Sequence, residues 1–139
     1  MKLKINFLDH IAITVNDLET SAQWYEHILG LKRYVFEKEW GPFPVFMLAG
    51  KSGLALFPAK KQATEPIQEV THPSMKHFAF NVDTENFENA KHLLKERNIS
   101  FEYQDHFFFD SIYFRDPDGY LVELTTPKVD KKSFFRELD

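Results

Sequence analysis

The chain has 139 residues, 43% of them hydrophobic, which is enough for one compact domain with a core and argues against disorder. Its formal net charge of −4 disfavours nucleic acid and anionic membranes as partners. The absence of cysteine excludes disulfides, thiolate metal ligands and cysteine nucleophiles. No apolar run approaches about 20 residues, and residues 1–6 lack a signal-peptide pattern, so we expect a cytoplasmic protein.

The chain repeats itself at an offset of 67 residues. Segment 10–15, His-Ile-Ala-Ile-Thr-Val, matches segment 77–82, His-Phe-Ala-Phe-Asn-Val, and both alternate as half-buried strands do. After the first, Asp17 can cap a helix that Gly30 ends. After the second, Thr84 can cap a helix that ends near Asn98.

Three short runs that are typical of strands follow each helix. They are residues 31–36, 45–48 and 54–57 in the first half, and 101–103, 112–114 and 120–125 in the second. The segment Asp-Pro-Asp-Gly at 116–119 indicates a tight turn. Residues 58–73 are polar, contain three prolines and read as a linker.

The predicted fold is therefore α+β, with two tandem βαβββ modules, each a curled mixed sheet covered by a helix, enclosing a ligand cavity. We expect one domain over residues 1–139. Module one spans about 5–58, the linker about 59–73, module two about 74–127, and a charged tail 128–139.

Strand alternation predicts a metal site. In segment 10–15 the aliphatic residues face the helix, so His10 faces the cavity, and His77 follows by the repeat. Glu123 lies between Val122 and Leu124 and shares the cavity face. Two imidazoles and one carboxylate suit one divalent ion, Fe, Mn, Zn, Ni or Co, with coordination positions left open for substrate.

Two further residues are candidates for acid–base roles. Tyr113 alternates with Ile112 and Phe114, which places its phenol on the cavity face, where it needs a hydrogen-bond partner. His106 precedes it in a loop or edge segment. The alternatives are that Tyr113 is only a wall residue and that His106 is only a solvated side chain.

Three segments carry a family resemblance: 8–12 (LDHIA), 24–31 (WYEHILGL) and 112–123 (IYFRDPDGYLVE). They resemble the vicinal oxygen chelate superfamily, which includes glyoxalase I, bleomycin and fosfomycin resistance proteins, and extradiol dioxygenases. The resemblance implies paired modules, a metal that chelates two neighbouring substrate oxygens, and a homodimer that completes its cavities across subunits.

Individual members fit to different degrees. Glyoxalase I takes a fourth ligand from the position of Ala55, which cannot ligate. Fosfomycin resistance enzymes share the two His, the Glu and Tyr113, but use a hydroxyl or thiol at Ala12 and basic groups around the phosphonate. Residues 100–111 contain no Lys or Arg, although Lys132 or Arg136 of the tail could supply one. Bleomycin-binding proteins lack the triad.

The local pattern of His106, Tyr113 and Glu123 matches the extradiol dioxygenases best. We therefore expect a metal-dependent enzyme acting on a small apolar or aromatic molecule, dioxygenase-like or lyase-like. The aromatic residues of 101–114 would form the pocket walls and disfavour a phosphonate. The alternatives are a non-catalytic binding or resistance protein and a glyoxalase-type lyase with an altered metal shell.

Overall fold

The computed structural model describes residues 1–69 and 71–130 and divides into two compact units, Met1–Glu65 and Pro66 onward. The boundary falls inside the segment expected as a linker. Among the described residues, no helix is both long and apolar enough to cross a membrane.

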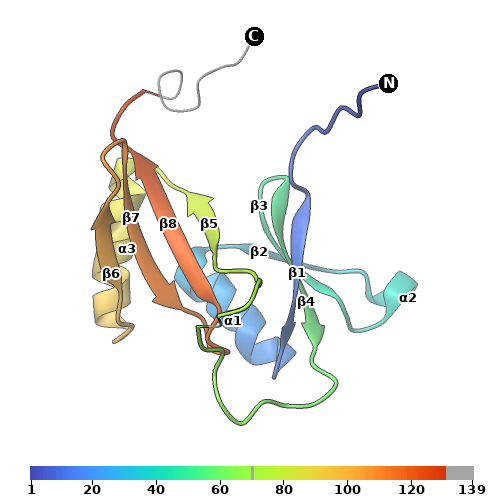
Figure 1. The fold of residues 1–139 in the computed structure, drawn as a ribbon. Helices are drawn as coiled ribbons and strands as arrows, with labels where there is room; N and C mark the ends of the chain where they lie inside the picture. Colours follow the sequence, from blue (N-terminus) through green and yellow to red (C-terminus); the bar gives the residue numbers. More distant parts are fainter. Residues whose placement is uncertain (70, 131–139) are drawn as a thin grey trace. The chain divides into compact units, whose positions relative to one another are not determined.

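The first unit is a four-stranded sheet with one long helix (Figure 1). Its elements are β1 (His10–Val15), α1 (Leu18–Leu29), β2 (Lys32–Val35), α2 (Glu37–Trp40), β3 (Val45–Ala49) and β4 (Ser52–Pro58). The strand order is β1-β4-β3-β2, with β1 parallel to β4 and the other pairs antiparallel.

The second unit has the same topology. Its elements are β5 (Phe78–Asn81), α3 (Thr84–Glu96), β6 (Glu102–Asp105), β7 (Phe109–Arg115) and β8 (Leu121–Pro127). The order is β5-β8-β7-β6, again with one parallel pair, β5 and β8. The predicted pair of βαβββ modules is confirmed, and the short helix α2 of the first unit is an addition that the sequence patterns did not predict.

Residue registers also align the two halves. Ala12 pairs with Ala55 between β1 and β4, and Ala79 pairs with Glu123 between β5 and β8. Ala12 and Ala79 are 67 residues apart, so Ala55 occupies the place in the first sheet that Glu123 occupies in the second. The equivalence expected from the repeat is confirmed.

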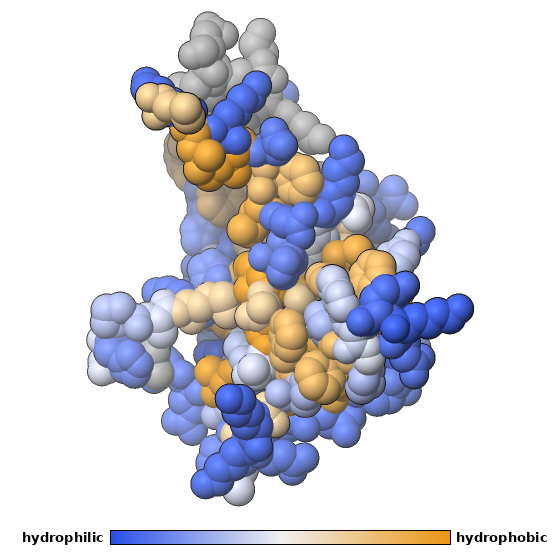
Figure 2. Space-filling model, turned by 90° about the vertical axis from the view of Figure 1, so that its right-hand side faces the viewer, coloured by the Kyte–Doolittle hydropathy of each residue, from blue (hydrophilic) through white to orange (hydrophobic). Residues whose placement is uncertain are grey.

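Each helix covers one face of its own sheet, and alternation sends the apolar residues there. In β1, Ile13 and Val15 are buried while His10, Ala12 and Thr14 are exposed. The core of the first unit includes Tyr25, Met47, Leu54 and Leu56, and that of the second Phe87, Leu94, Ile112, Phe114 and Val122. Hydrophobic residues also reach the surface among hydrophilic ones (Figure 2).

The helix ends follow local hydrogen-bonding rules. Asp17 accepts a hydrogen bond from the Thr20 amide at 2.7 Å, and Gly30 ends α1 at φ +65°, a conformation that favours glycine. The prediction for the second helix was wrong by one residue, because Asp83 is the N-cap and Thr84 is the first helical residue. Asp83 accepts from the Asn86 amide at 2.8 Å, and a carboxylate is as effective a cap as a hydroxyl.

The turn at 116–119 forms as predicted. The Asp116 carboxylate is buried and accepts hydrogen bonds from the amides of Asp118 and Tyr120, both at 2.9 Å. Gly119 has φ +94°, and a Cβ there would lie 2.6 Å from the backbone nitrogen of Ile67. The acidic run is therefore a structural turn that orients β8.

The N-cap of α1 generates a prediction. The amide of Thr20 holds the pKa of the Asp17 carboxyl below its usual value. A lowered folded-state pKa stabilises the fold above the unfolded-state pKa of about 3.9, and this contribution is lost as the pH falls. Asp17→Ala should lower the melting temperature at pH 7, and the difference should shrink below about pH 4. Asp17→Asn keeps an acceptor and should stay near wild type in thermal melts; equal losses in both variants would contradict this role.

Candidate metal and acid–base site

A buried carboxylate lies at the centre of the second sheet's open face. Glu123 is on β8, between β5 and β7, and only 5% of the residue is exposed. An ionised carboxylate removed from water is costly unless it is hydrogen-bonded or paired. Ser111 donates a hydrogen bond to its Oε1 at 2.6 Å, and Tyr113 donates to the same oxygen at 3.0 Å. The two hydroxyls thus satisfy one oxygen and leave the other for a different partner.

That other oxygen faces an imidazole. Nε2 of His77 lies 2.9 Å from Oε2 of Glu123, and the His77 ring packs edge-on to the Tyr113 ring at 5.6 Å. His77 directly precedes β5, whose first residue is Phe78, so it lies at the strand's entrance rather than within it as expected. Its Nδ1 is buried and has no hydrogen-bond partner.

The spacing of these two atoms fits a metal ion. Imidazole nitrogen and carboxylate oxygen each bind first-row divalent ions at about 2.1 Å, so two such ligands at a right angle are about 3 Å apart. The observed 2.9 Å between Nε2 and Oε2 agrees with that geometry. The same distance is that of an imidazole–carboxylate ion pair, so the assignment of His77 and Glu123 as metal ligands stays a prediction.

His106 joins the site through Tyr113. Its Nε2 lies 2.9 Å from the Tyr113 hydroxyl. Because an ionised carboxylate can only accept, the phenol must donate its proton to Glu123, and the hydroxyl oxygen then accepts from Nε2–H of His106. The result is a directed chain from His106 through Tyr113 to Glu123. The interpretation of His106 as a merely solvated residue does not account for this contact.

The pKa of the Tyr113 phenol is raised above its usual value. The larger cause is burial of the side chain, and the second is the neighbouring carboxylate of Glu123. The phenol therefore stays protonated through neutral pH and remains a hydrogen-bond donor. A donor of this kind can stabilise negative charge that develops on a substrate oxygen.

The third expected ligand, His10, begins β1 in the first unit. Its Nδ1 lies 2.7 Å from Oδ1 of Asp9, and since a carboxylate only accepts, Nδ1 carries the proton. In the neutral imidazole Nε2 is then the nitrogen free to bind a metal, and carboxylates commonly orient metal-binding histidines in this way. Within either unit, no three His, Asp or Glu side chains of residues 1–69 and 71–130 form a metal-binding group. The triad of His10, His77 and Glu123 stays a prediction.

The second unit brings together four of the residues that the sequence predicts for the site: His77, His106, Tyr113 and Glu123. The sequence patterns do not single out Ser111, which is fully buried and makes the shorter of the two hydroxyl hydrogen bonds to Glu123. The alternation that placed Tyr113 on the open face also places Ser111 there, two residues earlier. Asp9 was noted only as part of a motif.

A cavity of about 560 Å³ opens beside this cluster within the second unit. It is lined by Lys76, His77, Ser100, Phe101, Glu102, Gln104, His106, Tyr113, Phe114, Arg115 and Leu121. Phe101, Tyr113 and Phe114, from the segment expected to supply aromatic walls, line this cavity together with polar and charged side chains. Phe107 and Phe108 do not line the cavity and are 79% and 53% exposed. Residues 100–111 contain no Lys or Arg, but Lys76 and Arg115, from elsewhere in the second unit, place two cationic side chains in the cavity lining. Lys132 and Arg136 lie outside the described residues.

Comparison with known proteins gives consistent results. Residues 7–124 match the family model described as the Glyoxalase/Bleomycin resistance protein/Dioxygenase superfamily. The metallothiol transferase FosB of Staphylococcus epidermidis is 31% identical over 138 residues, covering 96% of this chain and 92% of that protein. The glutathione transferase FosA of Serratia marcescens is 28% identical over 117 residues, covering 84% and 78%.

A similar solved structure is a glyoxalase/dioxygenase from Nostoc punctiforme. It superimposes with a TM-score of 0.74 at 24% identity, covering 88% of this chain and 92% of that one. At this level of identity the likeness concerns the fold.

The role of Ser111 can be tested by stability. Ser111→Ala removes the shorter of two hydrogen bonds to a buried carboxylate and should cost about 1–3 kcal/mol of unfolding free energy in metal-free protein. Urea denaturation measures it. Ser100→Ala, at a serine that lines the cavity, should stay within about 0.5 kcal/mol. A neutral Ser111→Ala would show that Glu123 does not depend on this donor.

The Tyr113 phenol gives a spectroscopic prediction. Glu123→Gln removes the negative charge but leaves the phenol buried, so the Tyr113 pKa should fall toward, without reaching, the value of an exposed tyrosine. Carbon-13 NMR of ring-labelled tyrosine, with Tyr113→Phe for assignment, would follow the titration. Tyr34, which lies in the first unit, serves as the internal control and should not shift. An unchanged Tyr113 pKa would mean that the carboxylate is not its partner in solution.

Proposed function

This chain belongs to the Glyoxalase/Bleomycin resistance protein/Dioxygenase superfamily, and we propose that it is a divalent-metal-dependent enzyme that joins a thiol to a small electrophile. The observation that carries this proposal is the relationship to FosB over nearly the whole chain. The name of that relative specifies both a metal and a thiol, and the expected divalent ion agrees with it. The Glu123 cluster and its adjoining cavity are compatible with such a site.

We propose His10, His77 and Glu123 as the metal ligands, with the ion being Fe, Mn, Zn, Ni or Co. The support is the repeat, the 2.9 Å spacing of the His77 and Glu123 donor atoms, and the protonation of His10 on Nδ1. A bound divalent ion would supply Lewis-acid polarisation of two neighbouring substrate oxygens.

The protein's own residues would manage charge and protons. When a thiolate attacks an electrophilic carbon such as that of an epoxide, a C–S bond forms, a C–O bond breaks, and the released alkoxide takes up one proton. Tyr113 can give its proton to that oxygen, and Nε2–H of His106 can then return a proton to the phenol oxygen. Lys76 and Arg115 line the same cavity and can balance an anionic group on the substrate.

One departure bears on the identity of the electrophile. The fosfomycin resistance enzymes that the chain resembles use a hydroxyl or thiol two residues after the first His, where this chain has Ala12. The substrate class proposed here is therefore wider than phosphonates: a small electrophile that presents adjacent oxygens to the metal and has room beside Ala12 for an apolar group.

A second candidate is ring cleavage of a catechol by dioxygen. The specific observation is the direct connection of His106, Tyr113 and Glu123, the three residues of the dioxygenase-like motif. In that reaction the same phenol and imidazole would act as proton donor and acceptor beside the metal. Dimer formation and a cytoplasmic location remain predictions of the sequence.

Metal-loaded protein should convert a mixture of fosfomycin or a simple aryl epoxide with cysteine or glutathione into a thioether, detected by mass spectrometry. Chelator treatment should abolish the reaction. Glu123→Gln and His77→Ala should weaken metal affinity in calorimetry by at least about tenfold, whereas His92→Ala on α3 should not. Oxygen uptake with catechol and no thiol adduct would instead favour the dioxygenase, and metal stoichiometry unaffected by either site variant would refute the ligand assignment.

A further inference from the structure

The two units differ most in one connection. In the second unit, β6 and β7 are joined by the three residues 106–108, whereas β2 and β3 of the first unit are joined by the nine residues 36–44, which include α2. This added segment carries Phe36, Trp40 and Phe43. A segment added to a repeated fold needs its own explanation, because the simple turn of the other half already connects the strands.

The added segment places aromatic rings against the sheet. The ring centroids of Phe36 and Trp40 are 5.1 Å apart, and those of Phe46 on β3 lie 5.9 Å from Phe36 and 6.1 Å from Trp40. Phe36 and Trp40 are nevertheless 46% and 59% exposed. We call these three residues the aromatic platform. Contiguous exposed aromatic surface of this kind marks a binding site more often than isolated exposed residues do.

The platform adjoins the expected metal ligand. The ring of His10 meets the ring of Phe46 edge-on, with centroids 5.7 Å apart. Phe46 pairs with Ala55, and Ala55 pairs with Ala12, so the three residues form one row on the face that carries His10. Along this row, only the methyl group of Ala55 on β4 lies between β1 and Phe46.

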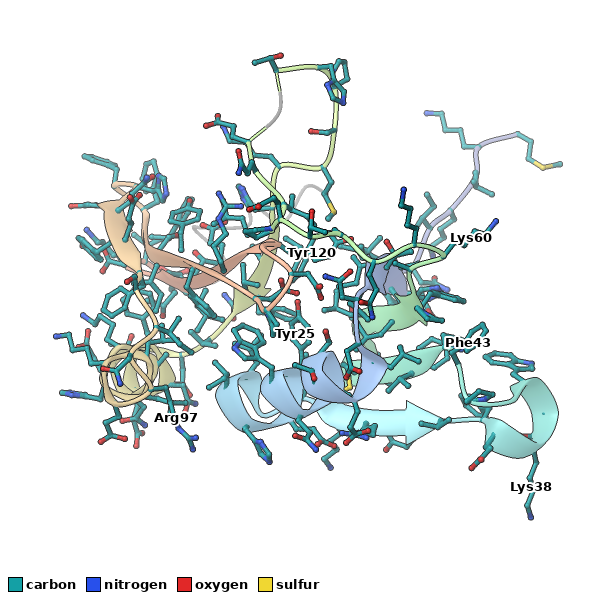
Figure 3. All side chains as sticks on the ribbon, turned by 90° about the horizontal axis from the view of Figure 1, so that it is seen from below. Tyr25, Lys38, Phe43, Lys60, Arg97 and Tyr120 are labelled. Carbon is teal, nitrogen blue, oxygen red and sulfur yellow. The ribbon has the colours of Figure 1, made fainter. Side chains whose placement is uncertain are left out.

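The outer parts of the segment complete this arrangement. Phe43, labelled in Figure 3, lies beyond α2 at the start of β3, and its ring contacts Phe57 of β4 at 6.4 Å. Lys38 extends from α2 away from the sheet in the same view (Figure 3). The charged side chain thus leaves the aromatic side of the segment uncovered.

We propose that the aromatic platform of Phe36, Trp40 and Phe46 is a substrate subsite that binds a flat apolar group, such as an aryl ring, attached to the oxygens held at His10. This inference rests on the proposed metal site and names the class of its substrate. We infer a small-molecule occupant from the contact between His10 and Phe46, whose ring centroids are 5.7 Å apart. A molecule bound beside His10 would bring an attached ring close to Phe46.

Two probes that share the same chelating oxygens test the subsite. Catechol and 2,3-dihydroxynaphthalene differ only by one fused ring, and calorimetry on metal-loaded protein gives the ratio of their affinities. An aromatic contact contributes about two- to tenfold in affinity. The ratio in wild type should exceed that of Trp40→Ala or Phe36→Ala by about this factor, while metal affinity stays unchanged. Phe107→Ala, at an exposed aromatic of the second unit, is the matched control.

Fluorescence provides an independent readout. The chain has two tryptophans, so Trp24→Phe leaves Trp40 as the single reporter. Dihydroxynaphthalene should quench it with the affinity measured by calorimetry, and catechol should quench it less. Equal ratios in wild type and Trp40→Ala, or no binding of either diol, would overturn the subsite. If the protein prefers the naphthalene diol but transfers no thiol, only the proposed reaction is refuted. If it transfers a thiol but shows no preference between the two diols, only the subsite is refuted.

Discussion

The second unit is organised around the cost of burying one carboxylate. Glu123 lies on the central strand β8, so neighbouring strands flank it on both sides and little water reaches it. Two hydroxyls of β7 satisfy one oxygen, and the residue before β5 supplies an imidazole for the other. Each of these partners must sit on the open face of the sheet, because the opposite face is filled by α3 and its core. The pairing register of β5, β7 and β8 therefore decides whether the buried Glu123 carboxylate has its hydrogen-bond and ion-pair partners.

The first unit shows what the same topology does without that charge. Ala55 replaces the carboxylate, its row neighbours are Ala12 and Phe46, and no polar network is needed. The surface is instead apolar and aromatic, with His10 at its edge. A duplicated fold has thus produced one polar and one apolar face. The same topology thus supports different side-chain chemistry in the two units, as expected when side chains rather than the fold determine function.

The comparisons with known proteins and the residues of the site give different kinds of information. The family model and the solved structures establish the fold, while the names of the curated relatives point to a metal and a thiol. The local residues then set limits on how closely this chain follows them. Lys76 and Arg115 retain a capacity for anions, whereas Ala12 lacks the hydroxyl or thiol of the fosfomycin resistance enzymes.

The repeat, the two modules, most strand and helix positions, and the open-face placement of His77, Tyr113 and Glu123 could all be predicted from the sequence. They depend on periodicity and on local caps and turns, which act between residues close in the chain. The bond from Ser111 to Glu123, the placement of Lys76 and Arg115 in one cavity, and the link from His106 to Tyr113 could not be predicted. These depend on which residues of different strands lie opposite one another, and on a turn that brings His106 back over β7. Such contacts join residues that are distant in sequence, so only the tertiary structure decides them.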